Sequence, residues 1–169
     1  MNEQAETRAS VTNLTTLLAS GFGVGLSPVA PGTVGSLLGI ACFYPLLGVS
    51  ASIQWLIFFV ACAVAIASAE RAGKAWGVID HPAIVIDEVV GVWLAVLIPL
   101  SLLTFSVSLP LVVVGAFLAF RLYDIVKPWP VNALERGLPG GWGVVMGDLA
   151  AGAMAGIVLT LVLLVIGPG

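Results

Sequence analysis

The sequence predicts an all-α integral membrane protein: a compact bundle of about five transmembrane helices with an interfacial or re-entrant N-terminal segment. Of its 169 residues, 60% are hydrophobic and 9% are charged, and the mean hydropathy is +1.14. Soluble domains have roughly 45–50% apolar residues, well below this value. At about 20 residues per span, the length allows four to six membrane helices.

The N-terminal part differs from the rest. Residues 1–10, MNEQAETRAS, are expected to form a cytosolic tail, because they lack the basic start of a secretory signal. Residues 11–169 are expected to form a single membrane-embedded domain. Residues 11–32 begin with a helical pattern and then break into glycine and proline, a density that cannot sustain a spanning helix. We expect an interfacial helix that leads into a re-entrant or surface loop.

Apolar runs account for the predicted spans, which cover approximately residues 33–49, 53–69, 89–106, 110–126 and 149–166. Only two or three small residues separate the first two, which predicts a tight helical hairpin. The last run contains a pair of small residues four positions apart, Gly152 and Gly156, which would let a neighbouring helix pack closely.

The polar residues between the fourth and fifth runs form the most unusual stretch. Lys127-Pro128-Trp129-Pro130 is expected to end the fourth helix, and the glycines at 140, 141 and 143 are expected to make a flexible turn. On this interpretation Asp148 lies immediately before the last helix. The loop either presents backbone N–H groups to an anion or only connects two helices.

Charge placement predicts the topology. With five spans and a cytoplasmic amino terminus, every Lys and Arg and every acidic residue falls on the cytoplasmic side, as the positive-inside rule requires for the cations. The outer side has short uncharged turns. A functional site is therefore expected at the cytoplasmic interface.

Four acidic residues lie at predicted helix ends, and in a compact bundle these ends share the same depth in the membrane. Asp87 and Glu88 precede the third run, Asp124 is near the end of the fourth, and Asp148 precedes the fifth. Carboxylates that converge without sulfur or imidazole favour a hard ion such as Mg²⁺. The alternative is that these acids only cap helices and interact with helix dipoles.

Cations accompany one of these acids. Arg121, Asp124 and Lys127 are spaced by three residues, so they share a helix face. Such a face either holds a phosphate beside a metal or forms an ion-pair ladder at the interface. The single histidine, His81, lies in a predicted loop and is more readily interpreted as incidental. A histidine-dependent lipid phosphatase usually needs a second histidine. If the site hydrolyses a phosphate ester, metal-activated water is therefore the most economical route.

Three ordered motifs resemble the phosphatidylglycerophosphatase A family of bacterial membrane enzymes. They are GFGVGLSPVAPGTVGSL, GVIDHPAIVIDEVVGVW and FRLYDIVKPWPVNALERGLPGGWGVVMGDLAAG, and the resemblance covers nearly the whole chain from Gly21 onward. It implies a Mg²⁺-dependent phosphatase of the bacterial inner membrane that converts phosphatidylglycerol phosphate in the bilayer to phosphatidylglycerol. The implied partners are this phospholipid and the membrane, with no nucleic acid.

The resemblance also implies roles for individual residues. The family's acidic motif positions, expected to bind the metal and to be catalytic, fall on Asp87, Glu88, Asp124 and Asp148. Its phosphate-binding positions fall on Arg121, Lys127 and Thr33. Asp80 and His81 also match motif positions, without an assigned role.

One position departs from the family pattern, which has two adjacent aspartates before the last helix where this chain has Gly147-Asp148. If the missing carboxylate is a metal ligand, another acid such as Asp80 would have to replace it. Two other functions therefore remain as alternatives: a non-catalytic lipid-binding subunit and a small cation-coupled transporter. A transporter would need charged residues deep inside its spans.

Overall fold

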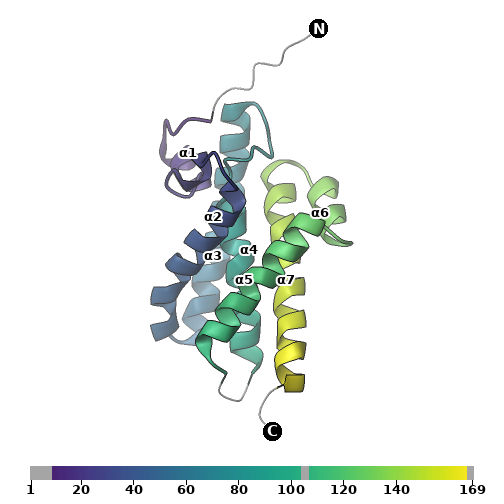
Figure 1. The fold of residues 1–169 in the computed structure, drawn as a ribbon. Coiled ribbons are helices and arrows are strands. Elements are labelled where there is room, and N and C mark those ends of the chain that lie inside the picture. Colours follow the sequence, from purple (N-terminus) through teal and green to yellow (C-terminus); the bar gives the residue numbers. More distant parts are fainter. Residues whose placement is uncertain (1–8, 104–106, 167–169) are drawn as a thin grey trace.

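The structure is a bundle of helices packed around one central helix (Figure 1). It is a computed structural model that describes residues 9–103 and 107–166. The described residues form no strand, and their helices are α1 (Leu14–Ala19), η1 (Val24–Leu26), α2 (Pro31–Phe43), η2 (Tyr44–Gly48), α3 (Ala51–Trp76), α4 (Ile86–Leu102), α5 (Leu109–Val126), α6 (Val131–Gly137) and α7 (Gly140–Ile166). The predicted all-α membrane bundle is thereby confirmed.

Within the described residues, four segments are long and apolar enough to cross a bilayer: Pro31–Gly48, Ala51–Trp76, Leu109–Val126 and Gly140–Ile166. The remaining predicted run forms α4, which has 17 residues and lies at the centre of the bundle. It contacts α2, α3, α5 and α7, the last most extensively. The outward faces of α3, α5 and α7 are apolar, as expected of surfaces that meet lipid.

The N-terminal segment forms a short helix and an irregular turn, as its sequence predicts. Asn13 caps α1 by accepting a hydrogen bond from the Thr16 N–H. The chain then takes positive φ values at Gly21, Phe22 and Gly23 before it enters α2. Residues 1–8 of the expected tail lie outside the described residues.

Glycines set the distance between α2 and α4. An added Cβ at Gly39 would lie 2.6 Å from Val92 Cγ1 and 3.0 Å from Val89 Cα. The indole N–H of Trp93 donates to the Gly39 carbonyl at 2.6 Å, across the same contact. A side chain at Gly39 would therefore push the two helices apart.

The last helix starts earlier than the sequence predicts. The glycine-rich segment at 140–143 is not a flexible turn: it is the first turn of α7, and the prediction that this helix starts near Leu149 was wrong. The glycines are needed for packing, because a Cβ at Gly141 would lie 2.5 Å from the Ile66 carbonyl oxygen of α3. Asp148 consequently lies two turns inside the helix.

Candidate active site

A close contact between α4 and α7 brings three acidic residues together. Gly91 of α4 faces Gly152 of α7, and a Cβ at Gly152 would overlap the Gly91 carbonyl oxygen. One helical turn before these glycines lie Asp87 and Asp148. The two helices therefore meet most closely next to the pair of carboxylates.

Asp87, Glu88 and Asp148 form one carboxylate cluster. One oxygen from each of them lies within 4.8 Å of the other two. Asp87 is 6% exposed and Asp148 is 7% exposed. Among the described residues, the oxygens Asp87 Oδ1, Glu88 Oε2 and Asp148 Oδ2 are buried and lack a hydrogen-bond partner. Buried carboxylates at this spacing repel one another unless a cation or protons offset their charge.

The cluster forms one side of a pocket of about 230 Å³. The pocket is lined by the loop before α4, the first turn of α4, the end of α5, and parts of α6 and α7, and its lining residues include Asp80, His81, Asp87, Glu88, Asp124, Lys127, Glu135, Val144 and Asp148. At about 30 Å³ per water molecule, it has room for a phosphate group and a few waters but not for two acyl chains.

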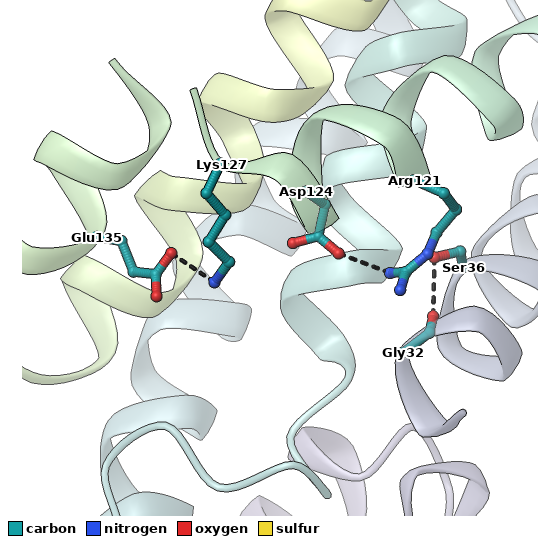
Figure 2. A network of polar contacts seen from close by, with 6 residues as sticks. All are labelled: Gly32, Ser36, Arg121, Asp124, Lys127 and Glu135. Carbon is teal, nitrogen blue, oxygen red and sulfur yellow. Dashed lines mark hydrogen bonds and ion pairs between the residues drawn. The ribbon is translucent and has the colours of Figure 1, made fainter. Parts of the chain in front are cut away.

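Two of the ion pairs among the described residues include pocket-lining side chains (Figure 2). The Arg121 guanidinium donates to Asp124 Oδ2 at 2.7 Å, and the Lys127 ammonium donates to Glu135 Oε2 at 2.5 Å. Asp124 is drawn between the two cations. Arg121 Nε is buried and has no hydrogen-bond partner among the described residues.

The start of α2 adjoins the carboxylate cluster from another side. A Cβ at Gly32 would overlap Glu88 Oε1 and would lie 3.1 Å from Arg121 Nη1. Gly32 therefore lets the first turn of α2, which contains Thr33, approach both residues. Further along the turn, the Ser36 hydroxyl donates to the Gly32 carbonyl at 2.8 Å (Figure 2).

The predicted site residues thus lie in three places. Asp87, Glu88 and Asp148 share the cluster, while Asp124 and Lys127 line the same pocket. Arg121 is joined to the pocket through Asp124. Thr33 lies in the first turn of α2 and is not a pocket-lining residue, so its assignment to phosphate binding stays a prediction.

The pocket also contains residues to which the sequence assigned no role. Glu135 comes from α6 and reaches the pocket through its ion pair with Lys127. Asp80 and His81 line the pocket from the loop before α4. The Nδ1 atom of His81 accepts the Ala83 N–H at 3.1 Å, so the ring proton of neutral His81 is on Nε2.

Neighbouring carboxylates alter the acid–base properties of Lys127. Partial burial acts to lower the pKa of the ammonium, but the hydrogen bond and charge of Glu135, with the charges of Asp124 and Asp80, outweigh it and raise the pKa above its ordinary value. Lys127 is therefore a fixed positive charge at neutral pH.

The donor set fits a hard divalent cation. Mg²⁺ prefers carboxylate and water oxygens, and the cluster supplies three buried carboxylate oxygens that no other group satisfies among the described residues. No cysteine and no histidine belongs to the cluster. Because these oxygens accept no hydrogen bond among the described residues, the interpretation of the three acids as simple helix caps is disfavoured.

The fold and the pocket define a membrane-embedded, multi-helix protein with an acidic, lysine-containing site near one end of its bundle. The family model described as "Phosphatidylglycerophosphatase A" matches residues 17–163. The chain belongs to this family, whose named members are phosphatases.

Individual relatives agree with the family match. The phosphatidylglycerophosphatase A of Escherichia coli is 33% identical over 92% of this chain and 87% of its own length. That of Haemophilus influenzae is 37% identical over 90% of each chain. A Bacteroides thetaiotaomicron protein, named provisionally as a phosphatidylinositol-3-phosphatase, is 37% identical over 91% of this chain and 96% of its own length. No solved structure shows significant similarity to the chain.

Proposed function

We propose that this protein is a Mg²⁺-dependent phosphatase that hydrolyses phosphatidylglycerol phosphate to phosphatidylglycerol and phosphate in the bacterial inner membrane. The substrate follows the names of two relatives that the chain matches over about nine-tenths of its length. The observation that carries the proposal is the convergence of Asp87, Glu88 and Asp148 in a pocket that also contains Lys127.

Asp87, Glu88 and Asp148 are the residues that would hold the metal, with Asp124 close by on the pocket wall. When bound there, Mg²⁺ supplies Lewis-acid polarisation of a phosphate oxygen and activation of water at neutral pH. In return, the cation would offset the charge that these three carboxylates concentrate in a small volume.

The basic residues bind the substrate's phosphate. Lys127 presents its ammonium to the pocket, and Arg121 adds a second positive charge beside Asp124. Both charges stabilise the negative charge of the phosphoryl group as it is transferred. Asp124 lies between these cations and lines the pocket. We assign to its carboxylate the role of orienting the attacking water.

The membrane holds the rest of the substrate. The pocket admits a phosphate group but not acyl chains, and the outer faces of the helices are apolar. The diacylglycerol part therefore stays in the bilayer while the headgroup enters the pocket. The lysine and arginine residues beyond residue 8 lie near the C-terminal ends of α3 and α5 and in α6. By the positive-inside rule, this end of the bundle, which contains the pocket, faces the cytoplasm.

The charge distribution disfavours transport. Beyond Asp148, residues 149–166 of α7 carry no charge, and neither do residues 89–102 of α4. A cation that enters the pocket has no charged path through the bundle along these two helices. A non-catalytic lipid-binding role would not explain why three carboxylate oxygens that have no hydrogen-bond partner among the described residues converge.

The test is phosphate release by purified protein from phosphatidylglycerol phosphate in detergent micelles, with thin-layer chromatography of the lipid product. The proposal predicts release of one phosphate per phosphatidylglycerol formed. Phosphatidylinositol 3-phosphate serves as the competing substrate. Absence of release from protein shown to be folded would refute the proposed activity, and exclusive hydrolysis of the inositol lipid would refute the proposed substrate.

A further inference from the structure

Gly147 provides the space in which the Glu135 side chain lies. Gly147 is buried in α7, and an added Cβ would lie 3.1 Å from Glu135 Cβ, 3.5 Å from Cγ and 3.5 Å from Oε2. The side chain of Glu135 therefore runs along the bare backbone of α7 from its first carbon to its carboxylate. One turn earlier, a Cβ at Gly143 would lie 2.5 Å from the Glu135 carbonyl oxygen, so α6 packs directly on a two-glycine face of α7.

At the end of this path the Glu135 carboxylate holds Lys127. The ion pair is 2.5 Å long, and the side chains are 21% and 38% exposed for Glu135 and Lys127. Lys127 ends α5 with φ 47° and ψ 54°, a left-handed conformation that is uncommon for a residue with a side chain. The direction of the Lys127 side chain is therefore set by an unusual backbone geometry and by Glu135, its ion-pair partner among the described residues.

Without this partner, other carboxylates of the same pocket would compete for the ammonium. Asp80 and Asp124 line the pocket together with Lys127 and interact with its charge. A lysine side chain has several rotatable bonds, so an unrestrained Lys127 would distribute among these acids. Its ammonium would then neutralise groups that surround the phosphate site, and it would have to be reordered each time a substrate binds.

We propose that Glu135 is the positioning residue for Lys127, and that the absence of a side chain at Gly147 is what lets Glu135 reach it. Glu135 fixes the ammonium at the wall of the pocket and keeps it away from Asp80 and Asp124. The inference rests on the proposed function, because it takes Lys127 to be a phosphate-binding residue. It adds a role for Glu135 and a reason for glycine at 147.

Phosphate-release kinetics test the coupling between the two positions. Glu135→Ala is expected to raise KM by roughly tenfold with a smaller change in kcat, the effect of losing one hydrogen bond to a charged group. Gly147→Leu, which fills the space occupied by Glu135, is expected to raise KM similarly. The double variant is expected to match Glu135→Ala alone, because both changes remove the same contact.

Two further variants control for folding and for helix packing. Gly137→Leu is the matched control, since a Cβ at Gly137 meets no atom within 4 Å, and it is expected to leave KM unchanged. Gly147→Ala places one carbon in the tight space and keeps the test available if the leucine variant does not fold. Independent, multiplying effects of Glu135→Ala and the substitution at 147 would overturn the proposal.

Chemical acylation of lysine provides a readout that does not depend on activity. The sequence has two lysines, Lys74 and Lys127, so Lys74 serves as an internal reference in the same sample. In the parent protein at pH 8.5, mass spectrometry is expected to show slower acetylation of Lys127, and Glu135→Ala is expected to raise the Lys127-to-Lys74 ratio severalfold. An unchanged ratio would overturn the positioning role. A protein that releases no phosphate yet shows this change would refute the proposed function alone.

Discussion

Replacing Asp148 by Asn should change stability in opposite directions without and with Mg²⁺. Asn has nearly the same shape as Asp but no charge, so the variant removes one member of the carboxylate cluster and keeps its packing. Without metal, the substitution relieves repulsion from Asp87 and Glu88. With metal, it removes a ligand.

The geometry gives the size of the repulsion, and the ratio of the Mg²⁺ concentration to its Kd gives the size of the metal effect. At the 4.8 Å limit of the cluster, two unit charges repel by about 1 kcal/mol in a water-like dielectric and about 3.5 kcal/mol at an effective dielectric constant of 20. For a chain of this length, about 1 kcal/mol corresponds to a shift in Tm of roughly 2–4 °C. A metal at 100 times its Kd stabilises the native state by about 2.7 kcal/mol.

Thermal unfolding in detergent at pH 8 measures these shifts, with a thiol-reactive fluorophore as the probe. Cys62 is buried and Cys42 is exposed, so a Cys42→Ala background leaves one thiol that reacts on unfolding. In chelator, Asp148→Asn should melt at least about 2 °C above the parent protein. In Mg²⁺ the parent should gain several degrees and the variant much less. An equal Mg²⁺-induced gain in both proteins would refute the assignment of Asp148 to a metal site.

Three other substitutions test separate features of the site and of the helix packing. Asp124→Asn should abolish phosphate release while the protein stays folded, and full activity in this variant would remove Asp124 from the mechanism. Gly152→Ala should destabilise the protein by about 1–3 kcal/mol in thermal unfolding, because it overpacks the α4–α7 contact, whereas Gly48→Ala, whose Cβ meets open space, should have little effect. Because the pKa of Lys127 is raised, its pairing with Glu135 stabilises the fold fully below the unfolded-state pKa of about 10.4, and this stabilisation is lost as the pH rises through the folded-state pKa. The difference in Tm between the parent protein and Glu135→Gln should therefore be constant from pH 7 to 9. A difference that already vanishes by pH 9 would contradict the raised pKa.

The apolar runs and the acids near their ends could be found from the sequence. Each run is long and apolar enough to predict a helix, and Asp87 and Glu88 do lie in the first turn of α4 as expected. The sequence does not show which helix ends are neighbours, so it could not establish that these two residues meet Asp148. The contact between Gly91 and Gly152 provides the missing information.

The start of α7 could not be predicted from local pattern. Glycine lowers helix propensity, so Gly140, Gly141 and Gly143 favoured a turn. Tertiary contact overrides that preference: Gly141 lies against α3 and Gly143 lies against α6, where side chains would not fit. The role of Glu135 was missed for a related reason, since only the packing of α6 on α7 brings its carboxylate into the pocket.

We propose that the carboxylate cluster holds a metal with which this membrane protein removes phosphate from a lipid. The most direct measurement is the Mg²⁺ dependence of phosphate release from phosphatidylglycerol phosphate, starting from purified protein stripped with excess chelator. We expect no release in chelator, saturable recovery with added Mg²⁺, and a large shift of that saturation to higher Mg²⁺ in Asp87→Asn. Full release in chelator, or the same Mg²⁺ dependence in Asp87→Asn, would contradict it.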